Sequence, residues 1–125
     1  MNREVINPQG LPAVNPTYSQ AVKANGLVFV AGQIGIDPAT GKLISSDIAE
    51  QARQAIENTA TILKAAGSSL ENVVSATLYL TEFEQLGRVN TVYAEYFPQA
   101  GPAKLACGVT ALWGGAKFEI QAIAV

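Results

Sequence analysis

Histidine is absent from this chain of 125 residues, and cysteine occurs once. The absence of histidine excludes the Ser-His-Asp and Cys-His catalytic arrangements and removes the commonest metal ligand. A single cysteine excludes a disulfide within the chain and a thiolate zinc cluster. We therefore expect no metal site, and any chemistry must use carboxylate, amine, phenol, amide and backbone groups together with water.

Long hydrophobic runs and an excess of basic charge are also missing. Charged residues make up 14% of the chain, and the formal net charge is -2. No apolar run approaches the roughly 18 residues of a membrane span, and the start of the chain does not read as a secretory signal. Neither a Lys and Arg cluster nor a glycine-rich phosphate loop is present. We expect a soluble cytoplasmic protein with one domain over 1–125, and neither nucleic acid nor a membrane as partner.

Two segments have the apolar spacing of amphipathic helices. Asp47 and Glu50 form a capping-box pattern, and apolar residues then recur every three or four positions until Gly67, which predicts a helix of about 19 residues. A second helix is predicted over 84–97, ending at a proline. Its apolar stripe is expected to include Phe83, Leu86, Tyr93 and Phe97, and Asn90 lies on the same stripe.

Strand patterns lie on both sides of these helices. An Asn25-Gly26 pair between apolar runs predicts a hairpin over 21–36, and residues 37–41 predict a further turn. Strands are predicted over 73–80, 103–112 and 117–125. Residues 1–19 contain three prolines and predict an irregular lead-in without a regular element.

Alternation in the last two strands predicts which side chains share a face. We expect Leu105 and Cys107 to face the helices, so that Lys104 points to the opposite face together with Glu119. Cys107 should then be a buried, inert thiol. The face away from the helices would also carry much apolar surface, which predicts self-association. Its apolar members are expected to be Leu27, Phe29, Val73, Tyr79, Ile123 and Val125.

Three stretches together resemble the RidA (YjgF-like) family: residues 15–22 (NPTYSQAV), residues 31–34 (AGQI) and residues 101–125. The resemblance implies an α+β, chorismate-mutase-like fold, with a six-stranded mixed sheet, two helices packed on one face, and a homotrimer with clefts at its subunit boundaries. It also implies cofactor-independent hydrolytic deamination of 2-imino acids or enamines, such as 2-aminoacrylate, to 2-keto acids and ammonia.

The resemblance also implies roles for individual residues. Lys104 stands where family members carry a substrate-binding Arg, and would bind a small-molecule carboxylate. Glu119 would position and activate water, and Tyr18 would contact the bound acid. Asn90 and Gly32 would contribute an amide and an accessible backbone.

Three positions depart from the family pattern. Ala31 replaces a Ser, and Ala106 replaces a Cys two residues after the basic position, although both still shape the implied pocket. Lys104 lacks the planar fork with which Arg binds a carboxylate through two parallel hydrogen bonds. Lys104 should therefore attract the negative charge of a bound acid, but orient that acid less well than an arginine would.

Other interpretations of these residues stay open at this point. Lys104 and Glu119 could form an ion pair on a strand face, Tyr18 could be an interface residue, and Asn90 could satisfy local backbone. At the level of the whole protein, the alternatives are a non-catalytic trimer that binds small carboxylates, and a hydrolase or deaminase with a different substrate on the same scaffold.

Overall fold

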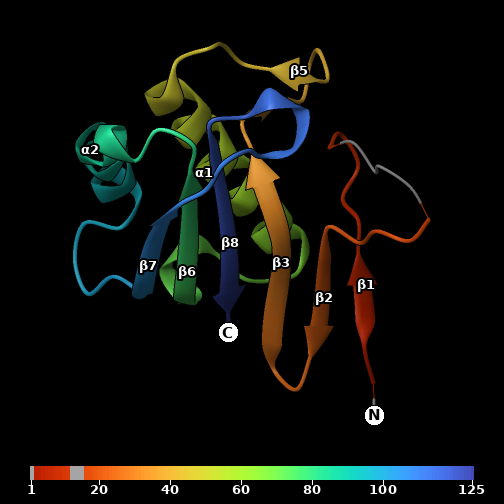
Figure 1. Ribbon diagram of the computed structural model, residues 1–125. Helices are drawn as coiled ribbons and strands as arrows, with labels where there is room; N and C mark the ends of the chain where they lie inside the picture. The colour runs from red at the N-terminus through yellow and green to blue at the C-terminus, as the bar shows by residue number, and fades with distance from the viewer. Residues whose placement is uncertain (1, 12–15) are drawn as a thin grey trace.

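The structure is a computed structural model that describes residues 2–11 and 16–125 (Figure 1). Within those residues, six strands form one sheet in the order β1-β2-β3-β8-β6-β7, and two α-helices pack on one of its faces. β6 and β7 run parallel, and the other neighbouring strands run antiparallel. The predicted α+β fold is confirmed. The elements are β1 (Glu4–Ile6), β2 (Ala21–Ala24), β3 (Leu27–Ile34), α1 (Ile48–Ala65), β6 (Val73–Leu80), α2 (Leu86–Tyr96), β7 (Ala103–Gly108) and β8 (Phe118–Ala124).

Helix α1 forms as its sequence predicts. The Asp47 carboxylate accepts a hydrogen bond from the Glu50 backbone N–H at 3.1 Å, and the chain leaves the helix at Gly67 with φ of 82°. The reciprocal half of the capping box is missing, because the Glu50 carboxylate accepts a hydrogen bond from the Ser45 hydroxyl instead. The apolar stripe of α1 packs on β3 and β8, the two central strands of the sheet.

Helix α2 begins later than predicted, since Phe83–Gln85 form a 3₁₀ turn before it. Val92 and Tyr93 are buried, and Asn90 is half-buried beside them. Phe83 is 46% exposed, so its predicted place on the buried face of the helix is wrong. The tighter 3₁₀ turn gives this residue a direction that the helical period does not describe.

Turns form where glycine permits a positive φ. Asn25 and Gly26 have φ of 53° and 75° and join β2 to β3, which confirms the hairpin. The predicted turn over 37–41 joins two short strands, β4 (Ile36–Asp37) and β5 (Lys42–Leu43), which pair as a small second sheet.

The prediction of an irregular lead-in is wrong for its first part. β1 pairs with β2 and buries Ile6, because the prolines come after these three residues and leave their backbone free to pair. Pro12, one of those prolines, lies outside the described residues.

The predicted orientation holds in β8 and fails in β7. Phe118 and Ile120 face the helices and are buried, so Glu119 lies on the open face, the side of the sheet without helices. In β7, however, Leu105 is 61% exposed, while Lys104 points toward α2. β7 is an edge strand that α2 covers only in part, so its apolar residues do not mark the helix side.

Two further predictions about the faces are corrected by this geometry. Cys107 pairs with Tyr79 in register, faces the open side and is only half-buried, so it is not a core thiol. A register shift between Val73 and Ser75 buries Val73 and leaves Val74 45% exposed, which reverses the expected placement of Val73.

The open face carries a continuous apolar surface. Val5, Val22, Phe29 and Ile123 follow one another across β1, β2, β3 and β8. Phe29 is 42% exposed, and no described helix covers this side of the sheet. An apolar sheet face of this kind is typical of a protein–protein interface.

Candidate functional site

Glu119 lies at the centre of the first group of site residues. It sits on β8 between Ile34 of β3 and Tyr79 of β6, and its side chain extends over the open face. The carboxylate lies directly against the backbone of Gly32, where a Cβ atom would overlap it. A side chain at position 32 would therefore displace the Glu119 carboxylate, which supports the assignment of Gly32 to the site.

A break in strand register builds this arrangement. The pairing of β3 with β8 shifts between Val30 and Gln33, so Ala31 and Gly32 form an irregular step. Irregularities of this kind bend a strand and redirect its side chains, and they are common beside active sites. Because of the shift, Ile34 and Glu119 stand opposite each other on the same face.

The Glu119 carboxylate is half-buried and unpaired. Among the described residues, none forms a hydrogen bond or an ion pair with it, and burial raises its pKa above the ordinary value of a glutamate. A carboxylate whose pKa lies closer to neutrality is a better proton acceptor in catalysis. The geometry therefore gives Glu119 the electrostatic properties of a general base.

Tyr18 and Gln33 lie beside this carboxylate. The Gln33 side-chain amide donates to the Tyr18 hydroxyl at 3.4 Å and to the Ala31 carbonyl at 3.2 Å. Burial raises the pKa of Tyr18, the hydrogen bond from Gln33 opposes that change, and the negative charge of Glu119 adds to it. Tyr18 therefore stays protonated and can donate to a ligand. Tyr18, Gly32, Gln33 and Glu119 are called the Glu119 group below.

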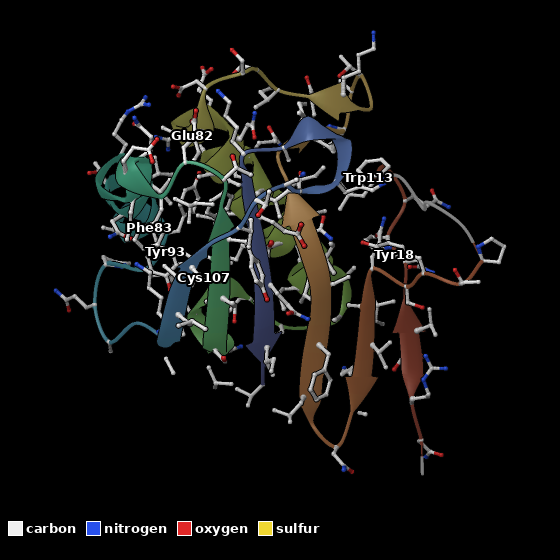
Figure 2. All side chains as sticks on the ribbon, viewed as in Figure 1. Tyr18, Glu82, Phe83, Tyr93, Cys107 and Trp113 are labelled. Atoms are coloured by element: carbon white, nitrogen blue, oxygen red, sulfur yellow. The ribbon has the colours of Figure 1, made fainter. Side chains whose placement is uncertain are left out.

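A cavity of about 450 Å³ opens beside the Glu119 group. Its wall contains all four members of the group, and also Leu11, Ile34, Ile36 and Trp113. In Figure 2, Tyr18 and Trp113 are labelled near each other on the right of the view, above the upper ends of β1 and β2. The cavity thus combines a carboxylate and a phenol with an apolar wall.

Lys104 lies at the centre of a second group. Its ammonium nitrogen is 2.5 Å from the Asn90 side-chain oxygen and 4.3 Å from the centre of the Tyr93 ring. Burial lowers the pKa of Lys104 below the ordinary value of a lysine. The amide and the aromatic ring both favour a positive charge at this point, so the geometry holds the cation in place.

Two more residues complete this second group. Ala106 follows Lys104 on the same side of β7 and packs against the core. Tyr93 stacks on Phe97 with ring centroids 4.5 Å apart, and its buried hydroxyl has no hydrogen-bond partner within the part of the chain described. Lys104, Asn90, Tyr93 and Ala106 are called the Lys104 group below.

The two groups do not meet within one chain. Lys104 is on the helix side of the edge strand β7, Glu119 is on the open side of β8, and β6 separates the two strands. The expectation that both charges share one face is therefore wrong, because the alternation in β7 is the reverse of the one predicted. In Figure 2, the label of Tyr93 is far from that of Tyr18.

Some site residues were not recognised from the sequence. Gln33 belongs to the AGQI stretch but carried no assigned role, and Tyr93 was counted as an apolar position of the second helix. Trp113 lies between two predicted strands, where no local pattern marks it. In each case the missing information is a long-range contact, which no local pattern contains.

The described residues bring together no group of three or more His, Cys, Asp or Glu that could hold a metal ion. None of the helices in residues 2–11 and 16–125 has both the length and the apolar character needed to cross a membrane.

Comparisons with known proteins agree with the geometry. Residues 9–125 match the family described as Endoribonuclease L-PSP. A RutC family protein of Pyrococcus horikoshii is 45% identical over 122 residues, covering 98% of this chain and 97% of that protein. The 2-iminobutanoate/2-iminopropanoate deaminase of Bos taurus is 44% identical over 123 residues, covering 98% and 90%. The crystal structure of E. coli TdcF with bound serine has a TM-score of 0.90 at 34% identity, covering 98% of each chain. This chain belongs to the Endoribonuclease L-PSP family, which is the YjgF/RidA family that its motifs resemble.

Proposed function

We propose that the protein hydrolyses 2-imino acids and their enamine tautomers, such as 2-aminoacrylate, to 2-keto acids and ammonia. The observation that carries this proposal is the half-buried, unpaired Glu119 carboxylate, held against Gly32 beside a cavity. Relatives named 2-iminobutanoate/2-iminopropanoate deaminase support it, at 42% to 45% identity.

The proposed site is shared between subunits of a homotrimer. One chain keeps Lys104 and Glu119 apart, but Lys104 lies on an edge strand where a neighbouring subunit can approach it. The apolar open face supplies a reason to associate, because burying it removes Phe29, Leu105 and Val125 from water. Association would then bring the Lys104 group of one subunit to the Glu119 group of another.

The chemistry follows from the two groups together. The ammonium of Lys104 binds the carboxylate of the protonated imine. The oxygen of a water molecule bonds to C2 while Glu119 takes one proton from that water, and the C=N electron pair moves to nitrogen, so the tetrahedral carbon bears a hydroxyl and a neutral amine. Glu119 then gives the proton to the amine, and as the C–N bond breaks and ammonia leaves, the hydroxyl loses its proton to Glu119 and becomes the carbonyl of the 2-keto acid. An enamine enters the same sequence after a proton has been added at its C3.

A second function is favoured by one specific feature. Lys104 already has a close amide partner and an aromatic ring, which is an arrangement suited to binding. A trimer that binds small carboxylates without hydrolysing them would use the same residues, and the related TdcF structure contains bound serine. A hydrolase or deaminase of another substrate is also compatible with the Glu119 group.

One experiment separates these functions. Purified protein is added to a serine dehydratase or amino-acid oxidase reaction, and the rate of 2-keto acid formation is followed. We expect faster formation with the wild-type protein and no acceleration with Glu119→Gln. Saturable keto-acid binding without acceleration would favour the binding trimer. RNA is tested as a further substrate. Cleavage of RNA would instead support an endoribonuclease activity, which the family's description names.

The oligomeric state is tested independently. We expect the solution mass of a trimer at micromolar concentration. A monomer at that concentration would remove both the interface and the shared site.

A further inference from the structure

Trp113 occupies an unusual place for a large aromatic side chain. It is 70% exposed and begins the 3₁₀ turn η3 (Trp113–Gly115). Gly114 and Gly115 have φ of 68° and 73°, values that other residues rarely adopt, so this turn depends on its two glycines. The turn closes with a hydrogen bond of 3.2 Å from the Ala116 N–H to the Trp113 carbonyl.

Contacts connect this turn to the Glu119 group. A Cβ at Gly114 would come within 3.8 Å of the Ile34 side chain, and Ile34 stands opposite Glu119 in the pairing of β3 with β8. Trp113 and Glu119 line the same cavity. The indole is therefore part of the wall of the space where the proposed reaction occurs, although its own chemistry takes no part in that reaction.

The rest of the wall divides by chemistry. Tyr18, Gln33 and Glu119 are polar and suit the imine of an imino acid. Gln20 and Asn58 are also polar, but their side-chain amides already donate to the backbone carbonyls of Leu11 and Ile36. Leu11, Ile34, Ile36 and Trp113 are apolar and have nothing to offer a carboxylate or an imine. The volume of about 450 Å³ lies in the range of about 300–1,000 Å³ that is typical of pockets for much larger ligands than a three-carbon acid.

We infer that Trp113 is a specificity-determining residue, which adapts this cavity to 2-imino acids with branched or aromatic apolar side chains. The inference rests on the proposed function, because the imine carbon of such a substrate would lie at the Glu119 group while Lys104 of a neighbouring subunit binds its carboxylate. The apolar side chain would lie against the indole and the isoleucines, and its removal from water would favour binding over that of a smaller substrate.

The first test compares substrates and two substitutions. Imino acids are generated from leucine, phenylalanine and alanine by an amino-acid oxidase, and kcat/KM is measured for each. Trp113→Ala should lower kcat/KM for the leucine- and phenylalanine-derived imines by at least about tenfold, and change the alanine-derived value by less than about twofold. Trp113→Phe is the matched control and should keep the preference, because it keeps an aromatic wall. Equal losses on all three substrates, or a wild-type preference for the alanine-derived imine, would overturn the inference.

The second test does not depend on catalysis. Because the chain has one tryptophan, its fluorescence reports on Trp113 alone. Titration with 4-methyl-2-oxopentanoate should change the emission at concentrations at least about tenfold lower than pyruvate requires. If the protein hydrolyses no imine, the proposed function is wrong. The difference between the two keto acids in this titration would still show whether Trp113 favours the larger apolar side chain. An emission that neither acid changes, combined with an altered mass of Trp113→Ala in solution, would assign the indole to a subunit contact and overturn the inference.

Discussion

The Glu119 group and the Lys104 group hold their charges in opposite ways. The Glu119 carboxylate has no hydrogen-bonding or ionic partner among the described residues, and it lies against the backbone of Gly32. The Lys104 ammonium is fixed by partners of its own, Asn90 and the ring of Tyr93. In the proposed reaction, the unpaired carboxylate takes a proton from water and the ammonium binds the carboxylate of the substrate. The two proposed roles therefore lie in separate parts of the fold.

The largest expected effect on catalysis comes from removing the unpaired negative charge of Glu119. Glu119→Gln should reduce kcat for imine hydrolysis by about 10²- to 10⁴-fold, the range expected when a general base is lost. Affinity for 2-keto acids should change far less, because the amide keeps the size of the side chain. Keto-acid formation and calorimetric titration give the two quantities.

The matched control for this substitution is Glu71→Gln, which removes an exposed carboxylate from the 3₁₀ turn η1 (Leu70–Asn72). It should leave kcat unchanged. A Glu119→Gln variant with nearly full activity would show that the Glu119 group has no catalytic role.

A second substitution changes only the position of the same charge. Gly32→Ala places a Cβ where the Glu119 carboxylate lies, so the carboxylate must move. We expect kcat to fall by about 10²-fold, because a displacement of about 1 Å can have that effect. Unfolding by denaturant should change little, since the displaced atoms are at the end of a flexible side chain.

Gly87→Ala serves as the control for Gly32→Ala, because a Cβ at Gly87 on α2 meets no other atom within 4 Å. It should keep full activity. Full activity in Gly32→Ala as well would mean that the close approach of Glu119 to the backbone is not needed for the reaction.

The next test concerns the positive charge of Lys104 and its role in ligand affinity. Lys104→Ala should raise the Kd for 2-keto acids by at least about tenfold, as expected when a charged hydrogen-bond donor is lost, and the protein should stay folded. Lys104→Arg should keep or raise both affinity and imine hydrolysis, because it restores the bidentate fork. Calorimetry and circular dichroism provide the measurements.

Lys64→Ala removes a positive charge from the last turn of α1 and should leave the Kd unchanged. Unchanged affinity in Lys104→Ala would exclude Lys104 from the ligand site, and would leave the Glu119 group as the whole site.

The smallest effect concerns pH. The raised pKa of Glu119 should shift the rising limb of kcat/KM against pH above the ordinary glutamate value of about 4.3, and the lowered pKa of Lys104 should shift the falling limb below about 10.4. Rate measurements across this range would show both limbs. A rising limb at the ordinary value would contradict the burial of Glu119.

The same raised pKa predicts a change in stability. The stability associated with protonated Glu119 is present below the unfolded pKa and is lost as pH rises through the folded pKa. Glu119→Gln, which cannot ionise, should therefore melt at a higher temperature than the wild type at neutral pH, with the difference disappearing in acid. A difference that persists in acid would contradict an ionic cause.

Local patterns were enough for the helices and the hairpin. The stripe of α1 and the Asn25-Gly26 turn concern residues that are close in the sequence, so spacing and backbone preferences determine them. The short strand β1 was missed, because three residues at a sheet edge carry too little pattern to be distinguished from the prolines around them.

The orientation of β7 could not be predicted from its pattern of alternating residues. The apolar set of Ala103, Leu105 and Cys107 was expected to face the helices, yet it faces the open side, where the continuous apolar surface extends. A sheet with two apolar faces does not reveal from its alternation which one a helix covers. The motif residues named as candidates for ligand contact fall into two groups in the structure, and the distance between these groups depends on this orientation.

The position of β8 in the sheet affects how the protein can be made. β8 follows the other five strands in the sequence, but it pairs between β3 and β6 at the centre. During synthesis, the early hairpin of β2 and β3 and the later β6-α2-β7 unit therefore have no shared strand until β8 leaves the ribosome. The Lys104 group lies within that later unit and can assemble before the end of the chain appears, whereas Tyr18 and Gly32 must wait for Glu119. The Lys104 group therefore needs only residues that are close in the order of synthesis, whereas the Glu119 group needs residues from both halves of the chain.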